Sequence, residues 1–375
     1  MRIGLLSTLH TNFGDDLVRE GIIQLLKGAF PDRQIDFVTV NKHTPLTVYP
    51  RSHPRRLVHQ LARLPSGQTL EGVIEGPLSA LGHSVFDDCD AIVQCGTPVV
   101  WPHCHECEWA EPIWHQVVGR LSRAGMPVLN LGAGSCYSWE NQPAVLEEKD
   151  ADYVRKILSY CRLTTVRDRL ARDLFKNVGQ ECPHMPCPAF LSGRAYGDEK
   201  ITGIPSDFIL INYMERAGHY DWGQQIDTTT WAQTVQTLVQ RLKPQHPLLF
   251  LCHDAAEFER AGQMAPGAPR YLAKTYAEYF AVLSRAAVGL CNRLHASVAL
   301  ASLGVPSLSV GNDTRMLMLE TLGLPFQYVK NTSAETLADT LHELLVRKNT
   351  ERDRLGALRA RTWDGYLPLI QKALA

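Results

Sequence analysis

The sequence predicts an α/β protein made of two Rossmann-like domains that face each other across a cleft. Short apolar runs alternate with stretches of helical spacing along most of the chain, as in doubly wound folds. Several of these runs end abruptly in polar or glycine-containing segments, as parallel strands do at the ligand-binding edge of a sheet. With 375 residues, the chain also exceeds the usual size of one hydrophobic core, so two domains are the default.

The composition narrows the class of protein. Apolar residues make up 45% of the chain and charged residues 21%, which is typical of a globular protein. Because 38 Lys and Arg nearly balance 39 Asp and Glu, no overall field would recruit nucleic acid or an acidic membrane. We see neither a signal peptide nor an apolar segment of the ~18 residues that a membrane span needs. Ten cysteines without an export signal indicate reduced thiols, so we expect a cytoplasmic protein.

We expect an N-terminal domain over residues 1–203. Its predicted strands are 2–7, 35–40, 90–94, 127–131 and 163–166, and its predicted helices start at 16 and cover 112–124, 150–161 and 169–176. Residues 43–80 are rich in Pro, Arg and His and are predicted as loop with short helices. The alternation of strands and helices predicts a parallel sheet.

A second domain is expected over residues 204–349. Its predicted strands are 207–213, 247–252, 288–290 and 307–310, and its predicted helices are 229–242, 275–286, 296–303, 314–322 and 333–348. Residues 350–375 are predicted as a C-terminal amphipathic helix, either continuous or broken at Asp364-Gly365, that can pack back on the N-terminal domain.

Arg293 and His295 form the most informative pair of residues. They lie two positions apart where the predicted strand 288–290 gives way to a helix of small residues. Backbone N–H groups converge at such an edge, so an anion is the natural ligand. The guanidinium fork of Arg293 suits carboxylate or phosphate oxygens, and His295 could deliver a proton near neutral pH. Alternatively, Arg293 pairs with a carboxylate and His295 caps the next helix.

Other strand ends supply weaker candidates. These are Asn12, Gly14 and Asp15 after the first strand, Gly96 in Cys95-Gly96-Thr97, Gly134 and Ser135 in a glycine loop, Arg167 after strand 163–166, and Asn312 and Asp313 after strand 307–310. Each also has a structural interpretation, since Asn, Gly and Asp form turns and helix caps. Neither glycine loop has the spacing of a Rossmann or Walker fingerprint.

The cluster His103, Cys104, His105, Glu106 and Cys107 suggests zinc at first sight. Its spacing fits no standard zinc finger, and successive residues do not easily converge on one tetrahedral ion. We therefore favour a structural or incidental role over a metal site, with Cys182 and Cys187 as further ligands if the cluster does bind a metal. Aromatic residues are not interleaved with a basic stripe, so nothing favours nucleic-acid binding.

Together these segments resemble the polysaccharide pyruvyl transferase family over most of the chain. The resemblance is carried by Asn12-x-Gly14-Asp15, the glycine loop after 128–131, Val166-Arg167-Asp168, and above all Asn292-Arg293-Leu294-His295-Ala296, followed by Gly304-Val305-Pro306-Ser307 and Asp313. The Arg-Leu-His element is fairly specific, whereas the other motifs are loose. The glycine run that relatives often carry after the third strand is replaced by Cys95-Gly96-Thr97-Pro98.

The resemblance implies a GT-B-like fold and transfer of a pyruvyl group from phosphoenolpyruvate onto two hydroxyls of a sugar, with no further cofactor. The acceptor would be a cell-surface glycan or its lipid-linked precursor, which leaves membrane-surface association and oligomerisation open. Arg293 and Arg167 would bind the donor, with the backbone of Leu294 beside them. His295 would protonate its methylene carbon, and Asp15 would lie near the donor or accept a proton from the sugar.

Two other functions use the same features. A GT-B glycosyltransferase with a nucleotide-activated sugar could hold its phosphates with the same arginines. A noncatalytic glycan- or nucleotide-binding protein could keep the fold but would not need the histidine acid. The intact Arg293-Leu294-His295 element therefore favours the pyruvyl transferase.

Overall fold

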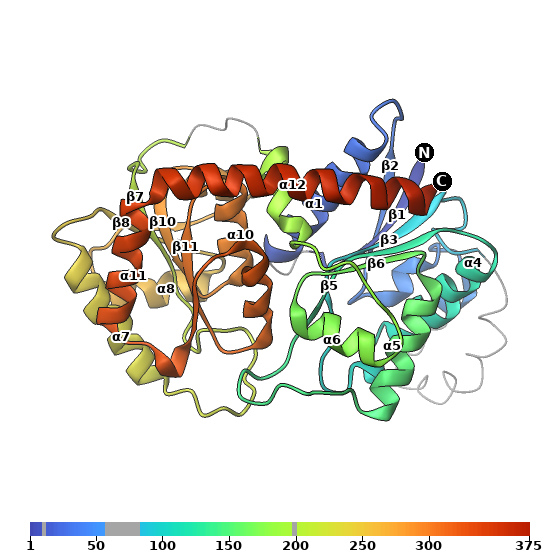
Figure 1. Cartoon of the computed structure of the whole chain (residues 1–375), viewed down its shortest axis with the longest axis horizontal. Coiled ribbons are helices and arrows are strands. Elements are labelled where there is room, and N and C mark those ends of the chain that lie inside the picture. Colours follow the sequence, from blue (N-terminus) through green and yellow to red (C-terminus); the bar gives the residue numbers. More distant parts are fainter. Residues whose placement is uncertain (10–12, 57–82, 197–200) are drawn as a thin grey trace.

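The computed structural model describes residues 1–9, 13–56, 83–196 and 201–375, and it contains two parallel β-sheets covered by helices (Figure 1). The first sheet comprises β1 (Arg2–Ser7), β2 (Asp36–Asn41), β3 (Ala91–Cys95), β4 (Pro98–Val100), β5 (Val128–Ser135) and β6 (Leu163–Val166). Its strand order is β2-β1-β3-β5-β4, with β6 also paired to β5. The helices of this half are α1 (Phe13–Ala29), η3 (Ala110–Val118), α4 (Gly119–Arg123), α5 (Glu148–Tyr160) and α6 (Arg169–Asn177), with the short helices η1 (Pro45–Val48), η2 (Cys104–Glu106) and η4 (Pro188–Ala195).

The second sheet has the order β12-β11-β10-β7-β8-β9, again with every pairing parallel. Its strands are β7 (Phe208–Asn212), β8 (Leu248–Cys252), β9 (Arg270–Leu272), β10 (Ala286–Cys291), β11 (Ser307–Gly311) and β12 (Phe326–Tyr328). The helices of this half are α7 (Thr228–Leu242), α8 (Ala255–Met264), α9 (Tyr276–Leu283), α10 (Leu294–Ser302), η5 (Thr314–Leu322), η6 (Val329–Asn331) and α11 (Ala334–Val346).

Helix α12 (Lys348–Leu374) runs from the second half of the molecule back to the first (Figure 1). Near its start, Arg354 donates to the carbonyl of Leu322 at 2.8 Å. Near its end, Gln371 donates to the carbonyl of Ala29 at 2.9 Å. The helix continues through Asp364 without the break that we considered there.

The predicted glycine loop at residues 132–135 is instead the end of strand β5. Ala133 pairs with Val166 of β6, while Gly134 and Ser135 pair with β4 on the other side. Neighbours on both sides give the backbone its hydrogen-bond partners, so the strand continues to Ser135. It is irregular at Gly132, which has a φ of 76° and lies where the register with β6 shifts. The prediction failed because β4, the partner of this segment, was not recognised in the sequence. Three elements of the second half, α8, β9 and β12, were also not predicted.

The two sheets face each other with the edges at which polar residues follow the strands. Because neighbouring parallel strands all end at one edge, β1, β2, β3 and β6 deliver the residues that follow them to a common surface. In the second sheet, β7, β8, β10 and β11 do the same. One apolar core joins α1, η4, α9, α10 and α12, so the two halves share buried contacts.

Candidate active site

A cavity of about 1000 Å³ lies between the carboxyl ends of the two sheets. Its lining includes seven of the residues singled out from the sequence: Gly14, Asp15, Gly96, Arg167, Arg293, Leu294 and His295. Four others, Gly134, Ser135, Asn312 and Asp313, are buried and do not line it. Asn12, another of the candidates from the sequence, lies outside the described residues. We refer to this space as the interdomain cavity.

Arg293 enters the interdomain cavity already paired with carboxylates. Its Nη2 lies 2.6 Å from Oε1 of Glu257 and 3.4 Å from Oδ2 of Asp254. Both acids belong to the start of α8, where Asp254 caps the helix by accepting from the backbone of Glu257. The ion pair that we considered as the alternative role of Arg293 is therefore present, inside the cavity wall.

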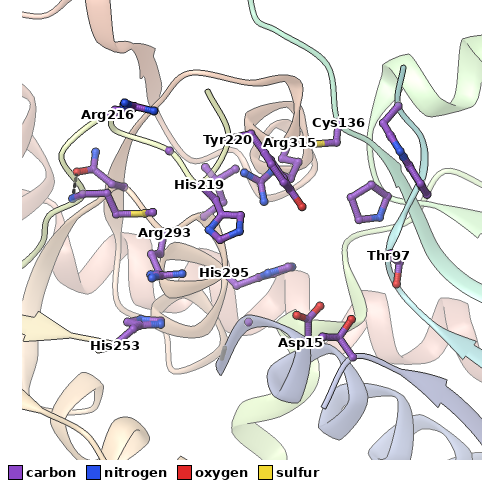
Figure 2. A pocket seen from close by; sticks show the side chains of 18 of the residues that line it. Asp15, Thr97, Cys136, Arg216, His219, Tyr220, His253, Arg293, His295 and Arg315 are labelled. Carbon is purple, nitrogen blue, oxygen red and sulfur yellow. Dashed lines mark hydrogen bonds between the residues drawn. The ribbon is translucent and has the colours of Figure 1, made fainter. Parts of the chain in front are cut away.

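His295 projects from the first turn of α10 toward Arg167, which follows β6 in the other half of the molecule. Its Nε2 lies 3.4 Å from Nη1 of Arg167 and 3.8 Å from Sγ of Cys187. Burial lowers the pKa of His295 well below its usual value, and the charges of Arg167 and Arg315 lower it further. His295 is thus neutral at pH 7, with Nε2 accepting the hydrogen bond from Arg167. Figure 2 shows His295 and Asp15 entering the cavity from different walls.

Buried polar residues next to Arg167 hold it in place. Its side chain is only 1% exposed, and its Nε has no hydrogen-bond partner among the described residues. The adjacent Asp168 caps α6 and accepts bonds from both the backbone and the hydroxyl of Ser135, at 2.8 and 2.9 Å. A Cβ at Gly134 would collide with Arg167 and Asp168. Gly134 and Ser135 therefore position Arg167 rather than contact the cavity.

Asn312 and Asp313 shape the opposite wall from behind. The amide of Asn312 donates to the carbonyls of Arg216 and Tyr220, at 3.2 and 3.0 Å, which fixes the loop after β7. Asp313 caps η5 and binds Arg315 through Nη2 at 2.6 Å. Both residues act on the cavity through neighbours that do line it.

Lys42 lines the interdomain cavity, although the sequence did not single it out. It follows β2, is 5% exposed, and donates to the hydroxyl of Thr97 at 3.3 Å. Its ammonium nitrogen lies 4.6 Å from the ring centroid of Trp109. Burial lowers the pKa of Lys42 to about 8, while the nearby charge of Asp15 opposes this shift.

The cations of the cavity fall into two groups. Of the six lysine and arginine side chains that line it, four have a carboxylate partner: Arg216 with Asp221, Arg260 with Glu215, Arg293 with Glu257, and Arg315 with Asp313. Lys42 and Arg167 have no carboxylate partner among the described residues. Both belong to the N-terminal half.

Histidines and aromatic rings complete the lining and also went unrecognised in the sequence. His253 follows β8 and is hydrogen bonded through Nε2 to the hydroxyl of Tyr279 at 3.0 Å. His219 lies on the loop after β7, and burial lowers its pKa. These residues, like Lys42, come directly or shortly after a strand, so inspecting every strand end would have found them.

The His/Cys cluster is organised by a carboxylate. Asp150, at the start of α5, accepts from the backbone N–H groups of His103 and His105, and it lies 2.6 Å from Nδ1 of His105. Cys104 is buried, and Cys107 contacts the hydroxyl of Tyr153 at 3.2 Å. Within the described ranges, no group of three or more His, Cys, Asp or Glu is arranged to hold a metal ion.

The fold and the site define the class. Two parallel-sheet domains with a polar cavity between their carboxyl edges form a GT-B-like architecture. The sequence model described as "Polysaccharide pyruvyl transferase" matches residues 12–314, which is most of the chain. The chain therefore belongs to the polysaccharide pyruvyl transferase family. No curated protein matches it significantly in sequence.

Solved structures share the fold at low sequence identity. A structure of MnaA with UDP from S. aureus has 11% identity and a TM-score of 0.54, covering 94% of this chain and 90% of that one. A UDP-GlcNAc 2-epimerase from Methanocaldococcus jannaschii, in complex with UDP-GlcNAc and UDP, has 13% identity and a TM-score of 0.51, covering 92% and 93%. At such identities the likeness concerns the fold alone. Among the described residues, no helix is both long and apolar enough to cross a membrane.

Proposed function

We propose that the protein transfers the pyruvyl group of phosphoenolpyruvate onto two hydroxyls of a sugar in a cell-surface glycan or its precursor. Protonation of the methylene carbon makes C2 electrophilic, and one hydroxyl adds there with loss of its proton. The C2–O bond to phosphate then breaks, and the second hydroxyl closes the ketal. One hydroxyl proton balances the proton that the methyl group gained, and the other leaves with phosphate. No metal or further cofactor takes part in this sequence of steps.

The observation that carries the proposal is the approach of Arg167 and His295 across the interdomain cavity, at 3.4 Å. A cation and an imidazole from different domains meet at one point, so a small anion placed there would touch both. Phosphoenolpyruvate carries its carboxylate and its phosphate on C2, next to the methylene carbon that needs a proton. Arginine offsets their charge, and histidine is the side chain best suited to give that proton near neutral pH.

His295 would become an acid only when the donor binds. Its pKa is lowered by burial and by Arg167 and Arg315, so an imidazole in this setting carries one proton. Donor anions beside the ring would favour the protonated form and raise that pKa. Protonated Nε2 can no longer accept from Arg167, whose guanidinium would then be released to bind donor oxygens. Donor binding and acid formation would thus occur together.

The acceptor sugar has a suitable surface at the mouth of the cavity. Trp101 and Trp109 line one side with ring centroids 5.8 Å apart, and Tyr220 and Trp222 line the other at 5.6 Å. Tyr220 is 44% exposed. Aromatic faces beside polar groups offer an apolar contact for a sugar ring while leaving its hydroxyls to hydrogen bond. We place Asp15 on the acceptor side as the group that takes a hydroxyl proton.

The test is a phosphate-release assay in which phosphoenolpyruvate is offered with a panel of saccharides, beside thermal-shift measurements with nucleotide sugars. We expect stabilisation by phosphoenolpyruvate and acceptor-dependent phosphate release. Stabilisation by a nucleotide sugar alone would instead support the glycosyltransferase alternative and overturn the proposal. The structural relatives in complex with UDP and UDP-GlcNAc make that control worthwhile.

A further inference from the structure

We propose that Lys42 and Arg167 form the anion subsite of the interdomain cavity and that Lys42 binds an anionic group of the donor directly. The inference rests on the proposed function and adds a residue to the donor site. It also places the donor's charge against the N-terminal wall, away from Arg293.

The ion pairs in the cavity determine which cations are available to an anionic ligand. Arg293 and Arg315 contact carboxylates at 2.6 Å, and an incoming anion would have to compete with Glu257 or Asp313 for them. Within the described part of the chain, neither Lys42 nor Arg167 forms an ion pair with a carboxylate, although the charge of Asp15 acts on Lys42. Both are nearly fully buried, at 5% and 1% exposure. A buried charge without a partner is costly, so these two cations gain most from an anionic ligand.

The surroundings of Lys42 fix the position of its ammonium group without neutralising it. The hydroxyl of Thr97 accepts one hydrogen bond from Nζ, and Thr97 in turn is held by Gln94 at 3.0 Å. The ring of Trp109 flanks the ammonium, a contact that favours the charged form. An ammonium has three donors, and among the described residues only Thr97 accepts from it, which leaves two donors for a ligand.

The charged and titratable groups facing Lys42 come from every element around it. Asp15 of α1, Cys107 and Glu108 before η3, and Arg167 after β6 all act on its charge. Burial dominates and lowers the pKa of Lys42 to about 8. If donor binding requires the ammonium form, donor affinity must fall as the pH rises above about 8. Arginine at this position would stay protonated and remove that loss.

The experiment measures the dissociation constant of phosphoenolpyruvate, and separately of inorganic phosphate and of pyruvate, by calorimetry. We compare the wild-type chain with Lys42→Met, which keeps the aliphatic stem against Trp109, and with Lys42→Arg. Lys149→Met, an exposed lysine of the same domain, is the matched control. We expect Lys42→Met to weaken phosphoenolpyruvate binding by about tenfold or more, since a charge-assisted hydrogen bond is lost. Lys149→Met should leave it unchanged.

The pH dependence of donor affinity tests the same proposal with Lys42→Arg, a variant that keeps the positive charge. Between pH 7 and 9 the affinity of Lys42→Arg should decline less steeply than that of the wild type. Parallel pH profiles, or a Lys42→Met affinity within twofold of wild type, would overturn the proposal even if the enzyme turns over phosphoenolpyruvate. Conversely, Lys42-dependent binding of phosphate by a chain that ignores phosphoenolpyruvate would uphold the anion subsite and refute the proposed donor.

Discussion

The surroundings of His295 shift its pKa away from the usual value of a histidine. Burial and two arginines lower its pKa, and the proposed reaction needs it raised again by the donor. A group that becomes protonated on binding takes a proton from solution. Donor affinity should therefore decrease as the pH rises from the lowered pKa of free His295, below 6.5, to the raised pKa of the complex.

We expect His295 to take up a proton when the donor binds. Calorimetry at pH 7, in buffers of different ionisation enthalpy, should show close to one proton taken up by His295 when phosphoenolpyruvate binds. Lys42 contributes little there, because its pKa of about 8 leaves it mostly protonated already. His295→Gln should abolish most of the uptake. Identical uptake in both proteins would show that the proton goes elsewhere.

Turnover should depend on the same side chain. We expect His295→Ala and His295→Gln to lower kcat by about 10²–10⁴-fold, the usual contribution of a general acid, while donor binding persists. Glutamine can still accept the hydrogen bond from Arg167 but cannot act as an acid, so it separates positioning from proton transfer. Full kcat in His295→Gln would refute the acid role.

At the residue scale, the prediction of site residues used one rule. Polar residues that follow a strand pointed to Asp15, Arg167, Arg293 and His295, and the structure places all four on one cavity, while their roles stay predictions. The rule could not reveal that Arg293 is neutralised by Glu257, because its partner lies on a helix that the sequence pattern did not predict. Which arginine is available to bind a ligand depends on ion pairs with residues distant in sequence, which a local pattern does not reveal.

At the scale of single elements, helix α1 packs closely against η4. The helix starts at Phe13, so Asp15 and Asp16 lie in its first turn, where carboxylates favour the helix dipole. Gly21 faces η4 so closely that a Cβ would overlap the carbonyl of Pro188. The helix that presents Asp15 is therefore positioned by a backbone contact that only glycine permits.

Gly21→Ala should destabilise the protein by about 1–3 kcal/mol, as overpacking does, despite the better helix propensity of alanine. Gly356→Ala on α12 is the control. A Cβ there meets nothing within 4 Å, so it should stabilise by about 0.5–1 kcal/mol. Denaturant unfolding of both variants checks the pair. Equal effects of the two substitutions would contradict the close approach of α1 and η4.

The elements themselves were largely predictable, and their exceptions have a physical reason. Long apolar runs gave most strands of both sheets within a residue or two. Short edge strands such as β4, β9 and β12 have only three residues each, too few for a periodic signal. The end of β5 looked like a loop because its glycines lack side chains, whereas its hydrogen-bond partners on β4 and β6 are distant in sequence.

At the scale of the whole molecule, α12 joins the two halves. Tyr366 is fully buried, and its hydroxyl donates to the carbonyl of Pro186 at 2.9 Å. Seven residues earlier in the helix, Arg359 donates to the carbonyl of Ser302 in the second half. Because the cavity lies between the two sheets, its shape depends on contacts that α12 makes on the far side from the site.

Tyr366→Phe should lower the free energy of unfolding by about 1–3 kcal/mol, since a buried carbonyl loses its donor. Tyr366→Ala should cost about 3–5 kcal/mol through the cavity it leaves. Lys372→Ala, at an exposed position of the same helix, should stay within about 0.5 kcal/mol of wild type. Urea unfolding followed by circular dichroism measures all three. A tyrosine effect no larger than that of Lys372→Ala would contradict the anchoring role.

The path of α12 also sets the order in which the protein can assemble during translation. The first sheet leaves the ribosome early, but the helix that packs on α1 and supplies Tyr366 emerges only after the second sheet has been synthesised. Until then, apolar side chains of α1 that α12 later covers stay open to solvent, in a nascent chain that is prone to association. Completion of the first domain is therefore tied to the folding of the second, and the interdomain cavity takes its final form last.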